Sequence, residues 1–286
     1  MLPSVSTHYI ALLGKPLGFS RASAMQNAAL RACKIDALYF PLECTQDDLP
    51  VLLPAFRRMP FFGFAITKPL KVKIMDYLDS VDLMSGQIGA CNTVKLENGC
   101  LVGYNTDGTG FAQALAEQID FTGKSMLVLG AGGAARAITF ACAVHGIGQI
   151  QIMNRTEERA QALALDLVHG TGVQAEALPY QTAIPREIME QVDILVNATG
   201  LGMQPYIGRS PIAADCLMPH VLVCDLAYNP LATQLLLDAK KIGCQTMNGL
   251  KMAGYQGAHQ FELLTGHQAP YEQMLSQMQR RERKGG

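Results

Sequence analysis

The sequence predicts an α/β fold made of two domains with mainly parallel sheets, and three observations lead to this prediction. Strand-like and helix-like segments alternate along the first third of the chain. The alternation starts again after Gly123. An order of strand, helix and strand places parallel strands in one sheet covered by helices. The third observation is length, since 286 residues are more than a single domain of about 100–200 residues contains.

The first series supplies strands and helices in alternation. Apolar runs at 8–14, 37–43 and 61–67 have the length and composition of buried strands. The segment 23–33 has helical spacing of its apolar residues, and 47–58 begins with two acidic residues, as helices often do. This order predicts parallel strands in the N-terminal domain.

The sequence predicts a β-hairpin directly after the first series. Two short β-rich runs flank Asn98-Gly99, which is the strongest short signal for a two-residue hairpin turn. With this turn, Asn92 faces Asn105 across the pair of strands. The chain then reaches Asp107 within two residues, so we expect Asn92 and Asp107 to meet at the open end of the hairpin.

A second series begins with an apolar strand at 125–130, which leads into a glycine-rich turn. A helix to about residue 145 and a strand at 149–153 follow. Buried strands at 193–199 and 221–228, a helix that ends at Gly243 and two final helical stretches complete the series.

Charge and composition exclude several classes of protein. The formal net charge is −1, from 23 basic and 24 acidic residues, so neither nucleic acid nor an anionic membrane is an expected partner. The eight cysteines form no Cys-x-x-Cys pair and the six histidines lack ligand spacing, so we expect no metal site. Dispersed cysteines are typical of buried thiols in a reducing compartment. The N-terminus lacks a secretory signal pattern and no apolar run reaches about 18 residues, which predicts a cytoplasmic protein without a membrane span.

The turn after 125–130 has the pattern of a dinucleotide-binding loop. Gly130, Gly132 and Gly133 follow a strand and open a helix, with Ala135 in the third position of the fingerprint. Glycines let the backbone approach a pyrophosphate, and the amino end of the helix favours its negative charge. A Rossmann domain is therefore predicted, with a plain strand-to-helix turn as the alternative.

The next strand ends where such folds usually carry an acidic residue that binds the ribose 2′-hydroxyl. This chain instead has Asn154 and Arg155, followed by Thr156, and Arg159 lies four residues beyond Arg155. One helical turn could place both guanidinium groups on a single 2′-phosphate. NADP is therefore favoured over NAD, with surface arginines that bind no ligand as the alternative.

Lys71 and Asp107 are the candidate catalytic residues. Leu70, Ile74 and Leu78 form the buried stripe of a predicted helix, and Lys71 lies off that stripe in its first turn. A cation is slightly unfavourable at this end of a helix, so a structural role does not explain the lysine. A solvated charge is the alternative for Lys71. A helix cap is the alternative for Asp107, and it does not exclude catalysis.

Several motifs resemble the shikimate dehydrogenase family, and they follow the family order nearly from end to end. The segments TKPLK, GACNTV and YNTDGTG contain the lysine, the asparagine and the aspartate described above. GKPLGFSRAS precedes them, and GAGGAARA, NRTEERA, NATGLGM, DLAYNPLATQLL and NGLKMAGYQGA follow. Several of these motifs are weak signals alone, but the whole set is specific.

The resemblance implies an NADP-dependent oxidoreductase that interconverts a ring alcohol and a ring ketone of a cyclic polyol carboxylic acid. The first substrate would be shikimate, with 3-dehydroshikimate as the ketone, in aromatic amino acid biosynthesis through chorismate. Lys71 and Asp107 would be the catalytic pair, and they would handle the hydroxyl proton as hydride moves to the nicotinamide.

The resemblance also implies a division of the chain. Residues 1–107 with 249–286 would form a substrate-binding catalytic domain, and 108–248 a Rossmann domain that binds NADP. The C-terminal helices would return to the N-terminal domain, because Gln256 shares the site of Lys71 by motif. Ring hydroxyls would contact Thr67, Asn92, Tyr228 and Gln256, and Ser20 would hold the carboxylate. The predicted NADP contacts are Gly130, Gly132, Gly133, Ala134, Asn154, Arg155, Thr156, Arg159, Thr199 and Gly249.

One segment departs from the family pattern. The alignment of GFSRASAM places Ser20 on the first family serine, Ala22 on the second and Ser23 on the proline that follows. A hydroxyl that would bind the substrate carboxylate is thus lost unless Ser23 replaces it. Weak binding of shikimate is therefore expected.

Three alternatives remain from the sequence. Quinate or another shikimate-like acid is an alternative substrate, and a catalytically weak NADP-binding regulator is an alternative function that the intact Lys71 and Asp107 disfavour. An enzyme of one-carbon folates is disfavoured by the complete set of family motifs. A monomer and a homodimer are both compatible with the sequence.

Overall fold

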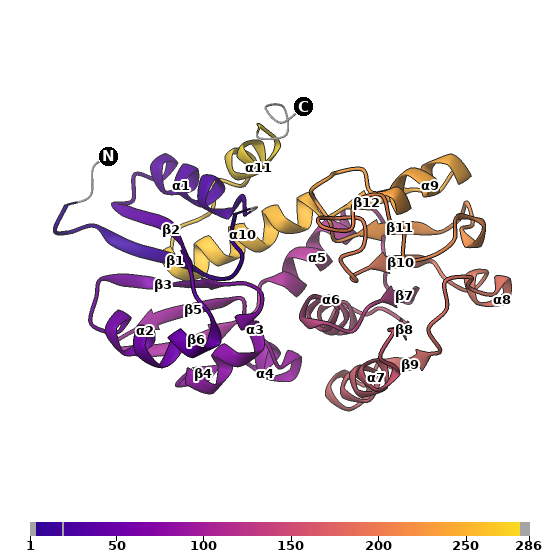
Figure 1. The fold of residues 1–286 in the computed structure, drawn as a ribbon, viewed down its shortest axis with the longest axis horizontal. Coiled ribbons are helices and arrows are strands. Elements are labelled where there is room, and N and C mark those ends of the chain that lie inside the picture. The colour runs from indigo at the N-terminus through magenta and orange to yellow at the C-terminus, as the bar shows by residue number, and fades with distance from the viewer. Residues whose placement is uncertain (1–3, 19, 281–286) are drawn as a thin grey trace. The chain divides into compact units, whose positions relative to one another are not determined.

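A computed structural model describes residues 4–18 and 20–280, and the chain forms two compact units. Unit 1 consists of Met1–Gly110 and Gly254–Gly286, and unit 2 consists of Phe111–Ala253. Each unit has its own six-stranded sheet and its own buried core (Figure 1). The C-terminal helices belong to the unit of the N-terminal strands, as the fold prediction states.

Unit 1 contains the predicted alternation of strands and helices, followed by the hairpin. Its strands are β1 (His8–Gly14), β2 (Ala37–Glu43), β3 (Phe61–Ile66), β4 (Ser80–Val81), β5 (Thr93–Glu97) and β6 (Cys100–Tyr104). Its helices, with η for a 3₁₀ helix, are α1 (Ala22–Ala32), η1 (Gln46–Asp48), α2 (Leu49–Phe56), α3 (Leu70–Lys73), η2 (Ile74–Tyr77), α4 (Leu83–Ile88), α5 (Asp107–Ala116), α10 (Leu250–Thr265) and α11 (Tyr271–Arg280). α5 and α10 each extend across the boundary into unit 2.

The sheet of unit 1 has the strand order β2-β1-β3-β5-β6-β4. β1 pairs in parallel with β2 and β3, and β4 pairs in parallel with β6. β5 is antiparallel to both of its neighbours, β3 and β6. Helices α1, α10 and α11 cover one face, and α2 and α3 cover the other (Figure 1). The mainly parallel sheet is confirmed, with the hairpin as its antiparallel part.

An aromatic cluster forms the centre of the core beneath α2 and α3. Phe56, Phe61 and Phe64 pack ring against ring, with centroids 4.8 to 5.2 Å apart. Leu70 and Ile74 belong to the same buried cluster and are fully buried. This packing fixes α3 on the sheet, and α3 carries Lys71 at its second residue.

The helix predicted after Pro69 is shorter than expected. α3 ends at Lys73 and continues as the tighter η2, and Leu78 already has an extended backbone with φ −86° and ψ 145°. Leu70 and Ile74 follow the predicted stripe, whereas Leu78 packs half-buried on the same core from the chain that leads into β4. β-branched and aromatic residues in this segment favour an early end of the helix.

The predicted register of the hairpin is confirmed. β5 and β6 pair from Glu97 with Cys100 to Thr93 with Tyr104, on either side of the Asn98-Gly99 turn. Asn98 has a positive φ of 51°, as a tight hairpin turn requires. The next position along this register joins Asn92 to the chain that leaves β6.

Unit 2 is a doubly wound parallel sheet. Its strands are β7 (Ser125–Leu129), β8 (Gln149–Met153), β9 (Gln174–Leu178), β10 (Ile194–Asn197), β11 (Leu222–Asp225) and β12 (Thr246–Asn248). Its helices are α6 (Gly133–Val144), α7 (Glu157–Thr171), α8 (Arg186–Met189), η3 (Ala214–Cys216) and α9 (Gln234–Ile242). The strand order β12-β11-β10-β7-β8-β9 is that of a Rossmann fold, and every pairing is parallel.

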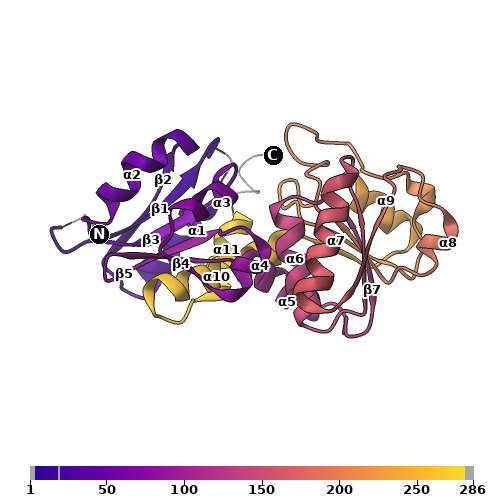
Figure 2. The same ribbon diagram turned by 90° about the horizontal axis from the view of Figure 1, so that it is seen from below.

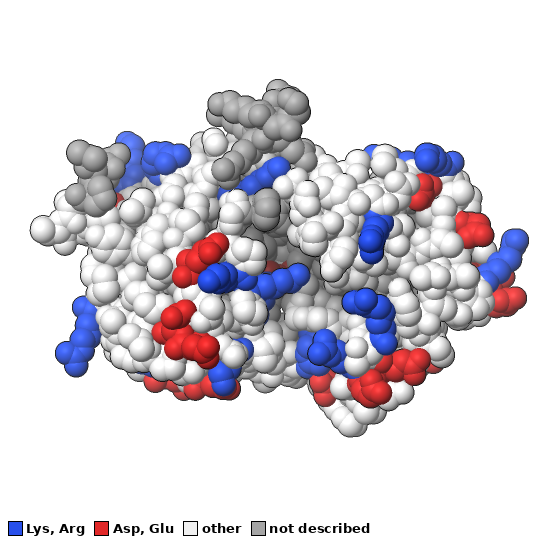
Figure 3. All heavy atoms as spheres, viewed as in Figure 1, with Lys and Arg blue, Asp and Glu red and all other residues white. Residues whose placement is uncertain are grey.

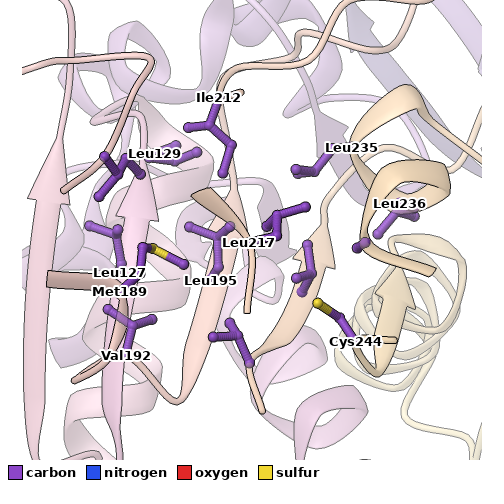
Figure 4. Close-up of a cluster of buried hydrophobic side chains, with 14 of the residues drawn as sticks. Leu127, Leu129, Met189, Val192, Leu195, Ile212, Leu217, Leu235, Leu236 and Cys244 are labelled. Carbon is purple, nitrogen blue, oxygen red and sulfur yellow. The ribbon is translucent and has the colours of Figure 1, made fainter. Parts of the chain in front are cut away.

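Helices cover both faces of this sheet, with α6 and α7 on one face and α8 and α9 on the other (Figure 2). On the second face, Leu127 and Leu195 from the strands meet Met189 of α8 and Leu235 of α9 (Figure 4). These side chains are at most 1% exposed. A buried core therefore holds the strands on the face covered by α8 and α9.

Six elements are not indicated by the sequence: β4, β9, β12, α4, α8 and η3. β9 consists of Gln174-Ala175-Glu176-Ala177-Leu178 at the edge of the sheet and has no fully buried residue. Gln, Ala and Glu are poor strand formers, so neither composition nor alternation identifies it. The expectation of buried thiols holds for five cysteines but is wrong for Cys100, which is exposed at the start of β6, and incomplete for the half-buried Cys33 and Cys216.

Charged side chains of both signs are interspersed over the face shown in Figure 3. Among the described residues, no group of three or more His, Cys, Asp and Glu side chains could hold a metal ion. None of the helices within residues 4–18 and 20–280 has the length and apolar character needed to cross a membrane.

Candidate functional site

One edge of the unit 1 sheet collects most of the predicted substrate and catalytic residues. β1 and β3 are parallel, and β5 runs against both β3 and β6, so β1, β3 and β6 all end at the edge where β5 begins. Thr67 directly follows β3, and Asn92 directly precedes β5. Asp107 comes shortly after β6 as the first residue of α5. The topology therefore brings together residues that are distant in sequence.

Lys71 and Asp107 form an ion pair at this edge. Lys71 Nζ lies 2.5 Å from Asp107 Oδ2, and the two side chains are 21% and 10% exposed. Such limited exposure leaves the pair partly screened from water, so its attraction is stronger than that of a surface pair. The carboxylate also lies at the amino end of α5, where the helix dipole favours a negative charge.

The side-chain amide of Asn92 fixes the other oxygen of the carboxylate. Asn92 Nδ2 donates to Asp107 Oδ1 and to Thr106 Oγ1, both at 2.9 Å. Asn92 Oδ1 accepts from the Thr106 backbone N–H at 2.8 Å and from Thr93 Oγ1 at 3.0 Å. Asn92 is buried, and both ends of its amide have partners. The predicted meeting of Asn92 and Asp107 is thus confirmed.

Helix α10 places Gln256 against the same group. Gln256 Oε1 lies 3.4 Å from Asn92 Nδ2, and its backbone carbonyl accepts from Thr106 Oγ1 at 3.0 Å. Gly110 of α5 makes this approach possible, because a Cβ atom there would lie only 2.5 Å from the Gln256 nitrogen. The hydroxyl and N–H of Thr106 both take part in the site, although the sequence predicts no role for this residue.

The segment that departs from the family pattern lies at the start of α1. Ser20 is half-buried, and its Oγ accepts from the Ala22 N–H at 3.3 Å. Ala22 and Ser23 are the first two residues of α1. Ser23 Oγ is buried without a hydrogen-bond partner among the described residues, so no solvent or ligand reaches it in this conformation. Ser23 therefore does not present the hydroxyl that Ala22 lacks.

The glycine-rich turn lies at the topological switch point of unit 2, between β7 and β10. Gly130 has a φ of 112°, and a Cβ there would lie 3.0 Å from the carbonyl of Ala198. The backbone conformation and the close approach of the neighbouring chain therefore require glycine at this position. Gly132 and Gly133 have nothing within 4 Å of the corresponding position. Their missing side chains leave open space at the amino end of the twelve-residue α6, as a pyrophosphate site requires.

The end of β8 carries the residues predicted to select the cofactor. Asn154 Oδ1 accepts from the Ala131 N–H at 3.2 Å and joins the end of β8 to the glycine-rich turn. Arg155, Thr156 and Arg159 are exposed, and neither arginine has an ion-pair partner among the described residues. One expectation is wrong, because α7 begins at Glu157. Arg155 precedes the helix, so its separation from Arg159 is not one helical turn.

A buried carboxylate organises the loops after β10 and β11. Asp225 Oδ2 accepts from Thr233 Oγ1 at 2.7 Å and from Asn197 Nδ2 at 3.0 Å, and Oδ1 accepts from the Ala227 N–H. Asn197 Oδ1 in turn accepts from the N–H and hydroxyl of Thr199. Burial raises the pKa of the Asp225 carboxyl above its usual value, while these hydrogen bonds act in the opposite direction. The sequence analysis did not identify this group; a buried strand that ends in Asp was its only signal.

Three of the remaining predicted residues lie in or beside these loops. Thr199 follows β10, and Tyr228 follows β11 and is half-buried. Gly249 follows β12, and its N–H donates to the Ala227 carbonyl at 2.9 Å. A Cβ on Gly249 would overlap the carbonyl of Leu226, so the backbone already requires glycine here. Ala134 is the second residue of α6.

Family comparisons agree with this arrangement over nearly the whole chain. The shikimate dehydrogenase substrate binding domain matches residues 12–94, and shikimate/quinate 5-dehydrogenase matches residues 111–230. The shikimate 5′-dehydrogenase C-terminal domain matches residues 249–279. The chain belongs to the shikimate dehydrogenase family. The resemblance found in the motifs is thus confirmed, and the chain is a shikimate dehydrogenase-like oxidoreductase.

Individual relatives match the chain over nearly its whole length. A shikimate dehydrogenase (NADP(+)) of Moorella thermoacetica is 42% identical over 268 residues, which are 93% of this chain and 90% of the relative. The crystal structure of shikimate 5-dehydrogenase from Listeria monocytogenes, in complex with shikimate and NAD, has a TM-score of 0.90 at 34% identity and covers 96% of this chain and 97% of that chain. Quinate dehydrogenase from Corynebacterium glutamicum, in complex with NAD, has a TM-score of 0.89 at 30% identity and covers 96% and 99%.

We expect the Asp225 group to stabilise this shikimate dehydrogenase family member. Thr233 is buried, and Thr233→Val keeps its shape but removes one donor from a buried carboxylate. The free energy of unfolding should fall by about 1–3 kcal/mol, measured by urea unfolding followed by circular dichroism. Thr233→Ser keeps the hydroxyl and should retain most of the stability. Equal stability of the valine variant and the wild type would contradict this role.

Proposed function

We propose that this chain is an NADP-dependent shikimate dehydrogenase that interconverts shikimate and 3-dehydroshikimate. The ion pair of Lys71 Nζ and Asp107 Oδ2 carries the proposal, because it supplies a proton-exchanging pair in a chain of this family. The substrate-binding catalytic domain is assigned to 1–107 with 249–286, and the NADP-binding Rossmann domain to 108–248. We place the enzyme in the cytoplasm, either as a monomer or as a homodimer.

The residues of unit 2 fit a dinucleotide phosphate. Gly132 and Gly133 leave open space at the amino end of α6, where the pyrophosphate would lie. Arg155 and Arg159 are exposed cations near the end of β8, where the 2′-phosphate of NADP would lie. The acidic residue that would bind the ribose of NAD is absent, since Asn154 occupies its position. Ala134, Thr156, Thr199 and Gly249 are assigned to the remaining cofactor contacts.

The chemistry supplied by bound NADP is acceptance and donation of hydride at its nicotinamide. The oxygen of the reacting ring carbon loses a proton in one direction and gains it in the other. Lys71 Nζ would exchange this proton, and Asp107 orients the amine through its Oδ2. Asn92 binds Asp107 Oδ1, so the carboxylate has a fixed direction before any substrate arrives.

Four polar side chains are assigned to the ring of the substrate. Thr67, Asn92 and Gln256 belong to the group at the sheet edge of unit 1, and Tyr228 contributes from the loop after β11. Asn92 already uses both amide hydrogens on short bonds, so a ring hydroxyl there would replace its long contact with Gln256. Ser20 is assigned to the carboxylate of the substrate.

An assay of NADP reduction with shikimate, quinate and related acids tests the proposal against its alternatives. Turnover of shikimate above all others supports it, and turnover of quinate alone assigns the chain to the alternative substrate. Binding of NADP without turnover of any acid would instead indicate a regulator.

Lys71→Ala should lower kcat by about 10²- to 10⁴-fold, since acid–base groups contribute rate enhancements of this size. Asp107→Asn should act in the same direction, and the double variant should cost less than the product of the two losses because the residues work as a unit. Lys73→Ala, two residues further along the same segment, removes an exposed lysine and serves as the control. Steady-state kinetics with shikimate are measured for the four variants and the wild type. Wild-type kcat in both single variants would remove the pair from the mechanism.

Arg155→Asp should weaken NADP binding by about tenfold or more and leave NAD binding much less affected, because a charge-assisted hydrogen bond contributes about 1.5–3 kcal/mol. Isothermal titration calorimetry with each cofactor gives both dissociation constants. Arg186→Asp changes another exposed arginine of unit 2 and should not alter the ratio of the two constants. Equal losses for NADP and NAD in the Arg155 variant would show that this residue does not select the cofactor.

Ala22→Ser should lower the KM for shikimate and leave kcat nearly unchanged. A missing donor to a charged acceptor costs about 1–3 kcal/mol, or roughly 5- to 150-fold in affinity. Ala24→Ser adds a hydroxyl at an exposed position of the same helix and is the control. A low KM in the wild type, or no change on Ala22→Ser, would indicate that another group binds the carboxylate or that the pocket suits a different acid.

A further inference from the structure

A line of buried side chains leads from α10 to the carboxylate of Asp107. Gln260 Nε2 donates to Thr93 Oγ1 at 2.9 Å and to the backbone carbonyl of Asn92 at 3.2 Å. Thr93 Oγ1 donates to Asn92 Oδ1 at 3.0 Å, and Asn92 Nδ2 donates to Asp107 Oδ1 at 2.9 Å. Gln260, Thr93 and Asn92 are at most 3% exposed. In each hydrogen bond along this line, the acceptor therefore lies nearer to the carboxylate than the donor does.

Each hydrogen bond of this line fixes which atom is the donor in the next one. Both amide hydrogens of Gln260 have acceptors, so its nitrogen must face Thr93. Thr93 Oγ1 accepts that bond and has one hydrogen left, which goes to Asn92 Oδ1. The Thr106 N–H donates to the same oxygen and cannot reverse its role. Asn92 Oδ1 is therefore held by two donors.

The opposite orientation of the Asn92 amide is excluded by these donors. A half-turn of the amide would bring Oδ1 against the Asp107 carboxylate and Nδ2 against the Thr106 N–H. Both contacts are repulsive, and buried polar groups without partners are costly. In the observed orientation, one Asn92 side-chain N–H donates to Asp107 Oδ1. Asp107 Oδ2 is then available to accept a hydrogen bond from Lys71 Nζ.

We propose that Thr93 and Gln260 are positioning residues for the Lys71–Asp107 pair. They act through Asn92, because they hold its amide in the one orientation that divides the two oxygens of Asp107 between Asn92 and Lys71. Neither residue is assigned to substrate or cofactor. The proposal rests on the proposed function for its kinetic test, and a spectroscopic test is independent of that function.

The first measurement compares Thr93→Val with Thr93→Ser in NADP-linked shikimate oxidation. Valine keeps the shape of threonine in a strand and removes the hydroxyl, so kcat should fall about three- to tenfold, the equivalent of one hydrogen bond. The KM for NADP should change little. Thr93→Ser restores the donor and should recover most of the rate. Thr7→Val makes the same exchange at a buried threonine that donates to Asp36, and it should leave kcat unaffected.

A double-mutant cycle with Asn92→Ala separates positioning from general stability. If Thr93 acts through Asn92, Thr93→Val should cost less than about twofold in kcat once Asn92 is absent. Gln260→Leu tests the far end of the line and should lower kcat less than Thr93→Val does. An equal loss in both backgrounds, or a wild-type kcat in Thr93→Val, would overturn the proposal.

The spectroscopic test uses the ligand-free protein. The side-chain amide signals of Asn92, identified by their loss in Asn92→Ala, should shift in Thr93→Val and remain in place in Thr93→Ser and Thr7→Val. Unchanged signals in Thr93→Val would contradict the proposal. If the wild type does not oxidise shikimate, the proposed function fails, but this test of the amide still stands.

Discussion

The register of the β5–β6 hairpin is the constraint on which the site depends. A two-residue turn at Asn98-Gly99 fixes which residues are opposite, and a shift by one residue would move every side chain of the hairpin to the other face. With the observed register, Asn92 and the start of α5 meet at the edge where β1 and β3 end. The position of Asp107 relative to Asn92 therefore depends on a turn at the opposite end of the hairpin.

Burial makes the polar group around Asn92 stiff as well as stable. Asn92, Thr93 and Thr106 lie out of contact with water, so each lost hydrogen bond would leave a costly unpaired group. Where such a network is fully satisfied, it holds one arrangement. The pair of Lys71 and Asp107 has the opposite character, because its partial exposure leaves it accessible to a substrate.

Much of the fold and site could be predicted because the signals are local. The Asn-Gly turn, the glycine-rich loop after an apolar strand and the lysine off a buried stripe each need only a few residues of sequence. The roles of Gln260 and Asp225 could not be predicted in this way. The role of a buried polar residue depends on its hydrogen-bond partners, which the sequence alone does not identify. Thr93 is more than 160 positions away from Gln260 along the chain. The early end of α3 has a local cause in its β-branched and aromatic residues, but the apolar spacing of Leu70, Ile74 and Leu78 predicts a longer helix.

The exposed arginines after β8 and the buried Asn92 differ in how easily they can be substituted during evolution. Arg155 and Arg159 are exposed side chains without protein partners among the described residues, so a lineage can exchange them one at a time with little effect on folding. Asn92 has no such freedom, because each of its polar atoms is shared with a neighbour. With the site residues proposed above, drift in cofactor preference should therefore be gradual and reversible, whereas a change in the proposed acid–base group would require several simultaneous substitutions.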